Sequence, residues 1–377
     1  MIKKRILHIP NYYPPHVGGI EDVCYNIVSN IDGFDHKVIC FNDIKKTQNE
    51  VYEGIDIIRC GVVKKISSQS ISFSFYKELK NVIKDFNPDI IHFHTPNPLS
   101  SIYLLLAISK KVKLILHWHS DIIEQKKLYF FYRPFEKKLL QRADKILTTS
   151  PTYSVGSNSL LSFKNKIQTI PNTVNIKKLT KKVEDEEAVK KIKDKYPNKK
   201  IIFTFGRHVT YKGLEYLIKA SPFISKEAVI IIAGKGPLTS QLKEISSDKK
   251  IQFIGRISDD ELRQFLYASD IFAFPSITRN EAFGVALAEA MYCGLPSVTF
   301  TILHSGVNWV CPHEITGIES PNKDYTALAE AINLLIADPS LRKKLGSNAS
   351  LRVKNIFTND AVNSELISVY KSLFDKI

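Results

Sequence analysis

Cysteine is scarce in this chain and shows no pairing pattern. The five cysteines are odd in number, no C-x-x-C motif occurs, and each lies in a stretch typical of a protein core. No group of histidines and cysteines has the spacing of a structural zinc site. The composition therefore predicts reduced thiols and a cytoplasmic location rather than a disulfide framework.

Long apolar runs are also missing. No run reaches the ~18–20 residues that a membrane-spanning helix needs. The first residues, MIKKRILHIPNYYPP, superficially resemble a signal peptide, but their apolar part is too short, and we expect residues 5–9 to form a first strand. A length of 377 residues, 44% of them hydrophobic, predicts two domains of ordinary size, each with its own core.

Acidic residues are fewer than basic ones: the chain has 38 Asp and Glu, 53 Lys and Arg, and a net charge of +15. The imbalance is larger in residues 1–172, which carry 24 Lys and Arg against 15 Asp and Glu. A basic protein can bind nucleic acid, anionic membrane or anionic small molecules. Since no known nucleic-acid motif occurs, we expect no nucleic-acid partner.

The chain does contain a regular alternation of strand-like and helix-like segments. Strand-like runs lie at 5–9, 37–41, 55–59, 89–93, 112–117 and 145–149, and again at 201–205, 229–233, 251–254, 271–274 and 296–300. This alternation is typical of α/β domains with mostly parallel sheets. Between the two sets, the charged stretch 172–200 has few large apolar residues and is predicted to connect the domains and to include a solvated helix.

Residues 281–294, EAFGVALAEAMYCG, place Glu281 and Glu289 eight positions apart. The apolar spacing after Gly284 predicts a helix that carries Glu289, with Glu281 in the loop before its first turn. The free amide groups of a first turn, together with the helix dipole, bind phosphate well. A carboxylate beside such a site can hold sugar hydroxyls, and one further along can hold a ribose. The alternative is two solvated glutamates on an ordinary helix.

Residues 201–213, IIFTFGRHVTYKG, predict a buried strand that ends at Gly206 and an exposed loop that carries Arg207 and Lys212. Two cations at the carboxyl end of a parallel strand are well placed for a diphosphate, although most such cations are simply solvated. The next strand ends in AGKGPL, with Gly234 and Gly236 suited to close backbone approach. This G-x-G is weak by itself, because the G-x-G-x-x-G spacing is absent.

These segments, in this order and spacing, resemble glycosyltransferase family 4. The second half contributes GRHVTYKG, AGKGPL, FIGRIS and the E-x7-E of EAFGVALAE, and the first half contributes YYPPHVGGIEDVCYNI, IIHFHTPNP, LILHWHSDII, ADKILTTSPTY and IPN at 170–172. The resemblance covers nearly the whole chain, and the joint order is far more specific than any single motif. HWHSDIIEQK, TSPTY and HSGVNWV are in addition similar to bacterial O-antigen mannosyltransferases and their relatives in surface-polysaccharide assembly.

The resemblance implies the α/β GT-B fold, with two Rossmann-like domains whose parallel sheets face a central cleft. We expect an acceptor domain over residues 1–172, a connection over 173–200 and a nucleotide-sugar domain over 201–358. The last helix, 359–377, is expected to cross back onto the first domain.

The resemblance also implies a retaining, metal-independent hexosyltransferase that needs no cofactor. Arg207 and Lys212 would neutralise the diphosphate, Glu281 would hold donor hydroxyls, and His119 and Asp121 would approach the donor sugar from the first domain; these five are the expected catalytic residues. Attack would come from the front face, with the leaving phosphate helping to deprotonate the acceptor. The expected donor-binding residues are Gly18, Gly19, Gly206, Gly234, Gly236, Ile257, Ala282, Phe283, Gly284, Val285 and Glu289.

The expected substrates rest on the resemblance alone. GDP-mannose leads as donor, with a UDP-hexose close behind, and the acceptor is expected to be a growing, lipid-linked surface polysaccharide such as O-antigen or capsule. A sugar-nucleotide epimerase of GT-B fold and an inactive scaffold are the rival hypotheses. Transfer, epimerisation and nucleoside-diphosphate binding separate them.

Two segments have competing interpretations. Residues 124–142, EQKKLYFFYRPFEKKLLQR, either rest on the anionic cytoplasmic face of the inner membrane or pack their aromatics inward, and Pro134 is expected to interrupt any long amphipathic helix. His92 and His94 alternate on a strand. We expect them to be structural, with only one of the two facing the cleft. Gly18 and Gly19 either make a turn or face a phosphate.

Overall fold

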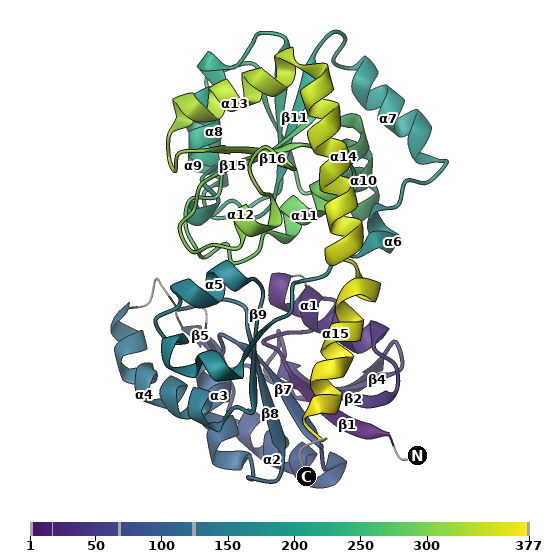
Figure 1. Cartoon of the computed structure of the whole chain (residues 1–377). Helices are drawn as coiled ribbons and strands as arrows, with labels where there is room; N and C mark the ends of the chain where they lie inside the picture. The colour runs from purple at the N-terminus through teal and green to yellow at the C-terminus, as the bar shows by residue number, and fades with distance from the viewer. Residues whose placement is uncertain (1–2, 17, 67–68, 123–125, 375–377) are drawn as a thin grey trace. The chain divides into compact units, whose positions relative to one another are not determined.

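The computed structural model describes residues 3–16, 18–66, 69–122 and 126–374. It divides into two compact units (Figure 1). Unit 1 contains the chain up to Pro171 together with the segment from Val362 onward, and unit 2 contains Asn172–Ala361. In the described ranges, no helix is both long and apolar enough to cross a bilayer.

Unit 1 is built on an eight-stranded sheet of order β10-β9-β8-β7-β1-β2-β4-β3, in which only β3 runs antiparallel to its neighbour. Its central strands are β7 (Ile90–Thr95), β1 (Lys4–Ile9) and β2 (Phe34–Phe41), with β8 (Lys113–Trp118), β9 (Lys145–Thr148) and β10 (Ile167–Thr169) on one side and β4 (Ile55–Cys60) and β3 (Gln48–Tyr52) on the other. A separate hairpin joins β5 (Lys64–Ile66) and β6 (Gln69–Ile71).

The helices of unit 1 are α1 (Gly19–Asn30), α2 (Phe75–Phe86), α3 (Pro98–Ala107), α4 (Lys126–Arg142), α5 (Pro151–Gly156), the 3₁₀ helix η1 (Leu161–Lys166) and the part of α15 (Asn359–Ser372) that begins at Val362. Side chains of α1 and α15 share one core cluster with Ile6, Ile90 and Ile115 of the sheet. The last helix thus packs into the core of unit 1.

Unit 2 has a six-stranded, fully parallel sheet of order β13-β12-β11-β14-β15-β16. The strands are β11 (Lys200–Phe205), β12 (Ala228–Ala233), β13 (Ile251–Gly255), β14 (Ile271–Phe274), β15 (Ser297–Phe300) and β16 (Gly317–Ser320). The surrounding helices are α6 (Ile176–Leu179), α7 (Asp185–Asp194), η2 (Thr210–Lys212), α8 (Leu214–Ala220), η3 (Ser221–Phe223), α9 (Thr239–Glu244), α10 (Asp259–Ala268), α11 (Val285–Tyr292), α12 (Val307–Val310), α13 (Tyr325–Ala337) and α14 (Pro339–Ile356).

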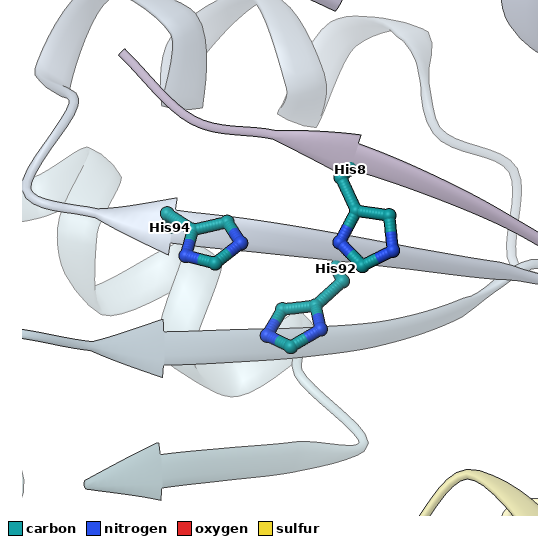
Figure 2. A group of neighbouring side chains, drawn as sticks. All are labelled: His8, His92 and His94. Atoms are coloured by element: carbon teal, nitrogen blue, oxygen red, sulfur yellow. The ribbon is translucent and has the colours of Figure 1, made fainter. Parts of the chain in front are cut away.

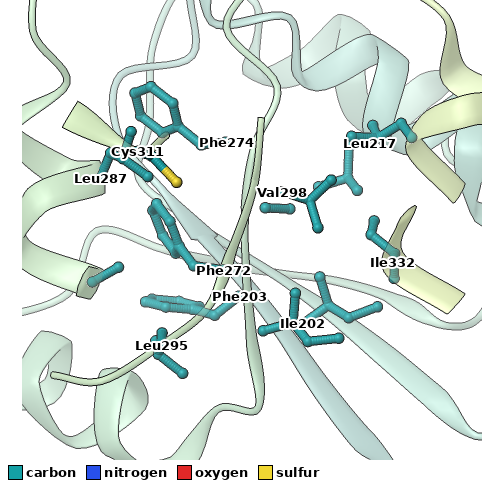
Figure 3. Packing of buried hydrophobic residues seen from close by; sticks show 14 of the residues in the cluster. Ile202, Phe203, Leu217, Phe272, Phe274, Leu287, Leu295, Val298, Cys311 and Ile332 are labelled. Carbon is teal, nitrogen blue, oxygen red and sulfur yellow. The ribbon is translucent and has the colours of Figure 1, made fainter. Parts of the chain in front are cut away.

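The core of unit 2 explains why its strands are continuous apolar runs. Every residue of β12, AVIIIA, is buried, as parallel strands covered on both faces must be. Figure 3 shows Ile202 with Leu217 and Ile332, whereas the next residue, Phe203, points towards Phe272. Leu217 belongs to α8 and Ile332 to α13, whereas the Phe203 ring also stacks on that of Phe265 in α10, with centroids 5.5 Å apart. Helices therefore cover both faces, as in a doubly wound sheet.

The α/β fold class predicted from the alternating pattern is confirmed, and each predicted strand is present within a few residues of its expected bounds. The strands that the pattern missed include β3 and β16, which have four or five residues each, and the three-residue β10. Most side chains of β3 are exposed, because it is the antiparallel edge strand. It therefore lacks the apolar run that marks a buried strand.

Two local expectations need correction. Helix α4 runs unbroken through Pro134. A proline removes only one backbone hydrogen bond, and here its ring lies on an exposed part of the helix. The stretch 172–200 contains the predicted helix as α7, in which only Asp185 and Val189 are buried, but the stretch belongs to unit 2 rather than forming a separate connection. Asp185 of α7 is fully buried and forms a two-pronged ion pair with the buried Arg263 of α10, at 2.6 and 2.8 Å.

Candidate active site

The loop after β11 in unit 2 carries the two cations that are predicted to bind the diphosphate. The strand ends at Phe205, Arg207 is exposed, and Lys212 closes the short helix η2 before α8 begins. Gly206, Arg207 and Lys212 line one small pocket together with Phe274 and Ser276, which lie at the carboxyl end of the neighbouring strand β14. The topology therefore brings both cations to the edge where the carboxyl ends of parallel strands meet.

Lys212 makes an ion pair that the sequence did not predict. Its Nζ atom donates to Oε2 of Glu281, which also accepts a 3.2 Å hydrogen bond from the Ser276 hydroxyl. The Lys212 side chain is 15% exposed and the Glu281 side chain 11% exposed. The expectation that Lys212 lies on an exposed loop is therefore wrong, because η2 turns its side chain inward over the Phe274 ring, 5.0 Å from Nζ to the ring centroid.

The charge state of Lys212 follows from this pairing. Burial alone would lower the pKa of its ammonium group, but the nearby Glu281 carboxylate, with smaller contributions from Tyr211 and Glu289, outweighs burial and raises the pKa. Lys212 is consequently a fixed cation at neutral pH. The effect of Glu289 also shows that the second carboxylate of the E-x7-E pair lies close enough to act on the same ammonium group.

Segment 281–285 is held in place by its backbone. The Ser305 hydroxyl donates to the carbonyl of Glu281, and the Gly306 amide donates to the carbonyl of Ala282 at 3.0 Å. Gly284 has φ +90°, and a Cβ atom there would lie 3.3 Å from the Phe274 ring, so glycine suits this position. The segment therefore holds the start of α11 against β14.

The predicted helix of this segment is present as α11, with Val285 at its first position, Glu281 in the preceding loop and Glu289 on the helix. Phe283, expected to bind donor, points its side chain into the core, where its ring lies 5.2 Å from that of Phe357. Only its backbone can serve a ligand. Ile257 likewise packs partly against the core of unit 2.

The glycines of the β12 loop have a packing role. Gly234 has φ +110°, and a Cβ atom there would lie 1.9 Å from the Gly206 carbonyl oxygen. A Cβ atom on Gly236 would lie 2.4 Å from the His208 carbonyl oxygen. Both glycines therefore let the backbones of the loops after β11 and β12 come into contact. This places the β12 loop beside the loop that carries Arg207 and Lys212.

In unit 1, the expected phosphate-facing turn precedes α1. Gly18 is extended, with φ −177°, and Gly19 begins the helix, where an added Cβ atom would meet none of the described residues within 4 Å. A Cβ atom on Gly18 would lie 2.2 Å from Oε2 of Glu21, a buried carboxylate in the first helical turn. Burial raises the pKa of Glu21. No sequence pattern assigned this glutamate a role, and its place beside the glycine turn is what singles it out.

His119 belongs to a buried group that we call the histidine cluster, formed by His8, His92, His94, His117 and His119. Figure 2 shows three of its members on neighbouring strands. The expectation that the side chains of His92 and His94 face opposite ways is wrong. Residues two apart on a strand share a face, and these two rings stack with centroids 4.7 Å apart.

The cluster is electrically neutral at physiological pH. Burial lowers the pKa of every member, and for His117 the value falls to about 3. Nδ1 of His94 lies 2.9 Å from Nε2 of His119, and Nε2 of His92 lies 3.2 Å from Nδ1 of His117. The predicted donor contact, His119, is therefore held by His94, a residue that the sequence marked as structural.

Two subsets of the cluster have the composition of a metal site. Ligand nitrogens of His8, His92 and His94, and those of His94, His117 and His119, lie within 4.8 Å of one another. Sequence spacing gave no hint of this, because the residues come from three different strands and, for His119, from the loop after β8. Several of these nitrogens already form hydrogen bonds with one another or with Tyr370, whose hydroxyl lies 2.7 Å from Nδ1 of His92. These contacts between the rings are those of packed, neutral histidines, and they do not require a bound metal ion.

Asp121 makes contacts inside unit 1. Its Oδ1 atom accepts hydrogen bonds from the Trp118 indole at 2.8 Å and from the Ser157 hydroxyl at 2.7 Å, and its backbone amide donates to the Tyr153 hydroxyl at 2.7 Å. These bonds tie the loop after β8 to α5. The carboxylate thus positions this loop, and its predicted contact with a donor sugar stays a prediction.

Comparison with known proteins agrees with this architecture. Residues 185–352 match the family model described as "Glycosyl transferases group 1", and residues 17–178 match the model described as "Glycosyltransferase Family 4". O-antigen chain mannosyltransferase C of Escherichia coli is 27% identical over 377 residues, 98% of this chain and 99% of the relative. D-rhamnosyltransferase WbpZ of Pseudomonas aeruginosa is 27% identical over 94% of this chain and 92% of its own.

Among solved structures, sucrose-phosphate synthase from Thermosynechococcus elongatus superposes with a TM-score of 0.80 at 20% identity, over 99% of each chain. At this identity the likeness shows the fold, which is that of GT-B glycosyltransferases.

Proposed function

The chain belongs to glycosyltransferase family 4, a family of retaining enzymes that use nucleotide-sugar donors, and from this premise we propose that it transfers a hexose, mannose from GDP-mannose, to a growing lipid-linked surface polysaccharide. Mannose is favoured because the O-antigen mannosyltransferase of E. coli is similar to this chain over nearly its full length. A UDP-hexose is the alternative donor.

The observation that carries the proposal is the Lys212–Glu281 pair at the carboxyl edge of the unit 2 sheet. An ammonium group has three N–H donors and uses one on Glu281 here. The others are available to phosphate oxygens, while Arg207 adds an exposed guanidinium from the same pocket. Among the described residues, Lys212 and Ser276 both donate to Oε2 of Glu281, so its second carboxylate oxygen can receive sugar hydroxyls.

These groups suit departure of a nucleoside diphosphate. Negative charge builds on the leaving phosphate as the glycosidic bond breaks, and cations already fixed in place stabilise such charge best. Lys212 is fixed by Glu281 and by the Phe274 ring, and the first-turn amides of α11 add a partial positive charge near Gly284. We propose that the acceptor attacks from the face that the phosphate leaves, and that a phosphate oxygen takes the acceptor proton.

We propose further that transfer needs no divalent metal. Arg207, Lys212 and the α11 amides supply the positive charge that a metal ion supplies in other transferases. Glu289 is proposed to hold the ribose, since it lies on α11 beyond the turn that would receive the phosphate.

Helix α4 supports a peripheral membrane contact. Phe130 and Phe131 are 73% and 72% exposed, and Leu128 is 53% exposed, among exposed cations of the same helix. Tyr129 and Tyr132 instead make hydrogen bonds inside unit 1. Of the two interpretations of 124–142, we therefore propose that α4 rests on an anionic leaflet. Residues 124 and 125 of that segment lie outside the described residues.

A binding screen followed by a transfer assay tests the function. Thermal unfolding is measured with GDP, UDP, ADP and their sugars, because a ligand at about 100 times its dissociation constant adds roughly 2.7 kcal/mol of stability. GDP and GDP-mannose are expected to stabilise most. Stabilisation by UDP-sugars alone would overturn the choice of donor, and stabilisation by no nucleoside diphosphate would overturn transferase activity altogether.

A further inference from the structure

Unit 1 has a hollow on its surface that the proposed chemistry does not use. It lies between α4 and the segment 158–163, as two adjoining depressions of about 150 and 340 Å³ that share Arg133, Asn158 and Ser159. The larger of the two volumes lies in the usual range for small-molecule sites. The hollow is lined entirely by residues of unit 1, whereas the cation pocket is lined by residues of unit 2.

A buried carboxylate forms part of the lining. Glu136 is 4% exposed, and its Oε2 atom accepts hydrogen bonds from the Tyr129 hydroxyl at 2.6 Å and the Ser159 hydroxyl at 2.9 Å. Within the described residues, its Oε1 atom has no hydrogen-bond partner. A carboxylate with one oxygen fixed and the other available is a strong acceptor for hydroxyl groups.

The rim of the hollow is cationic and polar. Arg133 and Lys137 are exposed and form no ion pair with any carboxylate in the described part of the chain. The side chains of Asn158 and Ser162 are exposed beside them. Two unpaired cations favour an anion. Amide, hydroxyl and carboxylate groups together favour a polyhydroxylated ligand.

The hollow is also linked to the loop that carries His119 and Asp121. Ser157, which precedes the Asn158–Ser159 pair, donates its hydroxyl to Asp121. Burial raises the pKa of Glu136, and the negative charge of Asp121 adds to that rise, whereas Tyr129, Ser159 and Arg133 oppose it. Through Ser157, the hollow therefore adjoins the loop of a predicted site residue, Asp121.

We propose that this hollow binds a phosphorylated sugar, with the phosphate at Arg133 and Lys137 and the sugar hydroxyls at Glu136 and Asn158. The inference rests on the proposed function, because a glycan acceptor joined to a phosphate is the substrate class that such a site would hold for transfer. The exposed aromatic residues of α4 beside the hollow suit an acceptor whose phosphate is anchored in a membrane.

Isothermal titration with mannose 1-phosphate tests the site, with GDP present in excess to occupy the donor pocket. Arg133→Ala is expected to weaken binding about tenfold, the loss typical of one charged hydrogen bond. Glu136→Gln should weaken mannose 1-phosphate and leave inorganic phosphate unchanged. Because Glu136 is buried, the exposed Asn158→Ala serves as a second sugar-side variant if Glu136→Gln fails to fold. Lys138→Ala, an exposed cation of the same helix outside the lining, is the matched control and should bind normally.

Three results would overturn the proposal: no binding of mannose 1-phosphate to the unmodified protein, equal binding to Arg133→Ala, or inorganic phosphate binding as tightly as the sugar phosphate. GDP and GDP-mannose binding is measured on the same samples, so that failure of the donor site is seen separately from failure of this one.

Vesicle binding identifies the source of the ligand. Phosphatidylcholine vesicles are used with and without a polyprenyl phosphomannose. Recruitment that needs both the sugar lipid and Arg133 assigns the site to a lipid-linked acceptor, whereas binding of mannose 1-phosphate without such recruitment assigns it to a soluble sugar phosphate. Recruitment to undoped vesicles that Arg133→Ala leaves unchanged, without any sugar-phosphate binding, would reduce the hollow to part of a membrane surface and refute the proposal.

Discussion

Replacing Lys212 with methionine should destabilise unit 2 as well as abolish transfer, because the substitution leaves the Glu281 carboxylate nearly buried and without its cation. Removing one partner of a buried pair costs about 3–5 kcal/mol. The Glu281 side chain keeps 11% exposure and the Ser276 hydrogen bond, so we expect a smaller loss of about 1–3 kcal/mol. Transfer should fall at least about a hundredfold, the scale for losing one group that stabilises transition-state charge.

Arg207→Met is the matched control. Arg207 lines the same pocket, but it is exposed and has no ion pair among the described residues. Its loss should change the free energy of unfolding by less than about 0.5 kcal/mol and still lower transfer by about a hundredfold or more. The two cations are thus expected to be alike in activity and different in stability.

A double-mutant cycle over Lys212→Met and Glu281→Gln measures the pair directly by denaturant unfolding of unit 2. The double variant should be more stable than the sum of the single losses predicts, with a coupling of about 1 kcal/mol or more. A coupling near zero, or equal destabilisation by Lys212→Met and Arg207→Met, would refute the interpretation of this pair as a fixed, largely buried ion pair.

Three further outcomes are expected. Transfer should persist in EDTA, and complete inhibition that Mg²⁺ or Mn²⁺ reverses would contradict the metal-free proposal. By isothermal titration, Glu281→Gln should weaken GDP-mannose about ten- to a hundredfold and spare GDP, whereas Glu289→Gln should weaken both; equal losses for both ligands in Glu281→Gln would remove Glu281 from the sugar. Unit 1 should lose stability in mild acid, because the pKa values of the buried histidines are lowered and the unfolded chain therefore binds more protons. The free energy of unfolding should be constant above about pH 6.5, the pKa of a histidine in the unfolded chain. Below that pH it should fall by up to about 1.4 kcal/mol per pH unit for each member of the histidine cluster. Denaturant unfolding followed by circular dichroism between about pH 7 and 5 checks this, and a flat profile would argue against neutral buried rings.

The sequence predicts the fold well because parallel strands leave a strong local signal. The runs at 201–205 and 229–233 are apolar almost throughout, since helices cover both faces of the sheet. β3 is missed for the opposite reason, because it is an edge strand with exposed side chains. The burial of Asp185 could not be predicted, because a charged helix pattern cannot show that one of its carboxylates pairs with a buried arginine 78 positions away.

In the candidate site, too, features set by neighbouring residues could be predicted, whereas contacts between distant residues could not. The loop of Arg207, the helix that carries Glu289 and the first-turn position of Val285 follow from spacing, and the structure has them where the spacing places them. The pairing of Lys212 with Glu281 joins residues 69 positions apart, and only the neighbouring positions of β11 and β14 in the sheet bring them together. The same applies to the histidine cluster, whose members come from three strands and the loop after β8.

The histidine cluster also decides what His119 can offer a ligand. His36, which is not a member of the cluster, fixes the proton positions at one end of it: its Nε2 atom must donate to the Ile31 carbonyl, 2.9 Å away, because a carbonyl oxygen can only accept. Nδ1 of His36 then accepts from Nε2 of His8 at 3.0 Å. No carbonyl among the described residues fixes the His94–His119 contact in this way. If Nδ1 of His94 donates, Nε2 of His119 accepts and the remaining proton of His119 sits on Nδ1, where it is a donor; the reverse leaves Nδ1 of His119 an acceptor. The hydrogen-bonding character predicted for His119 is therefore set by His94, which makes His94 part of the candidate site although no ligand need ever touch it.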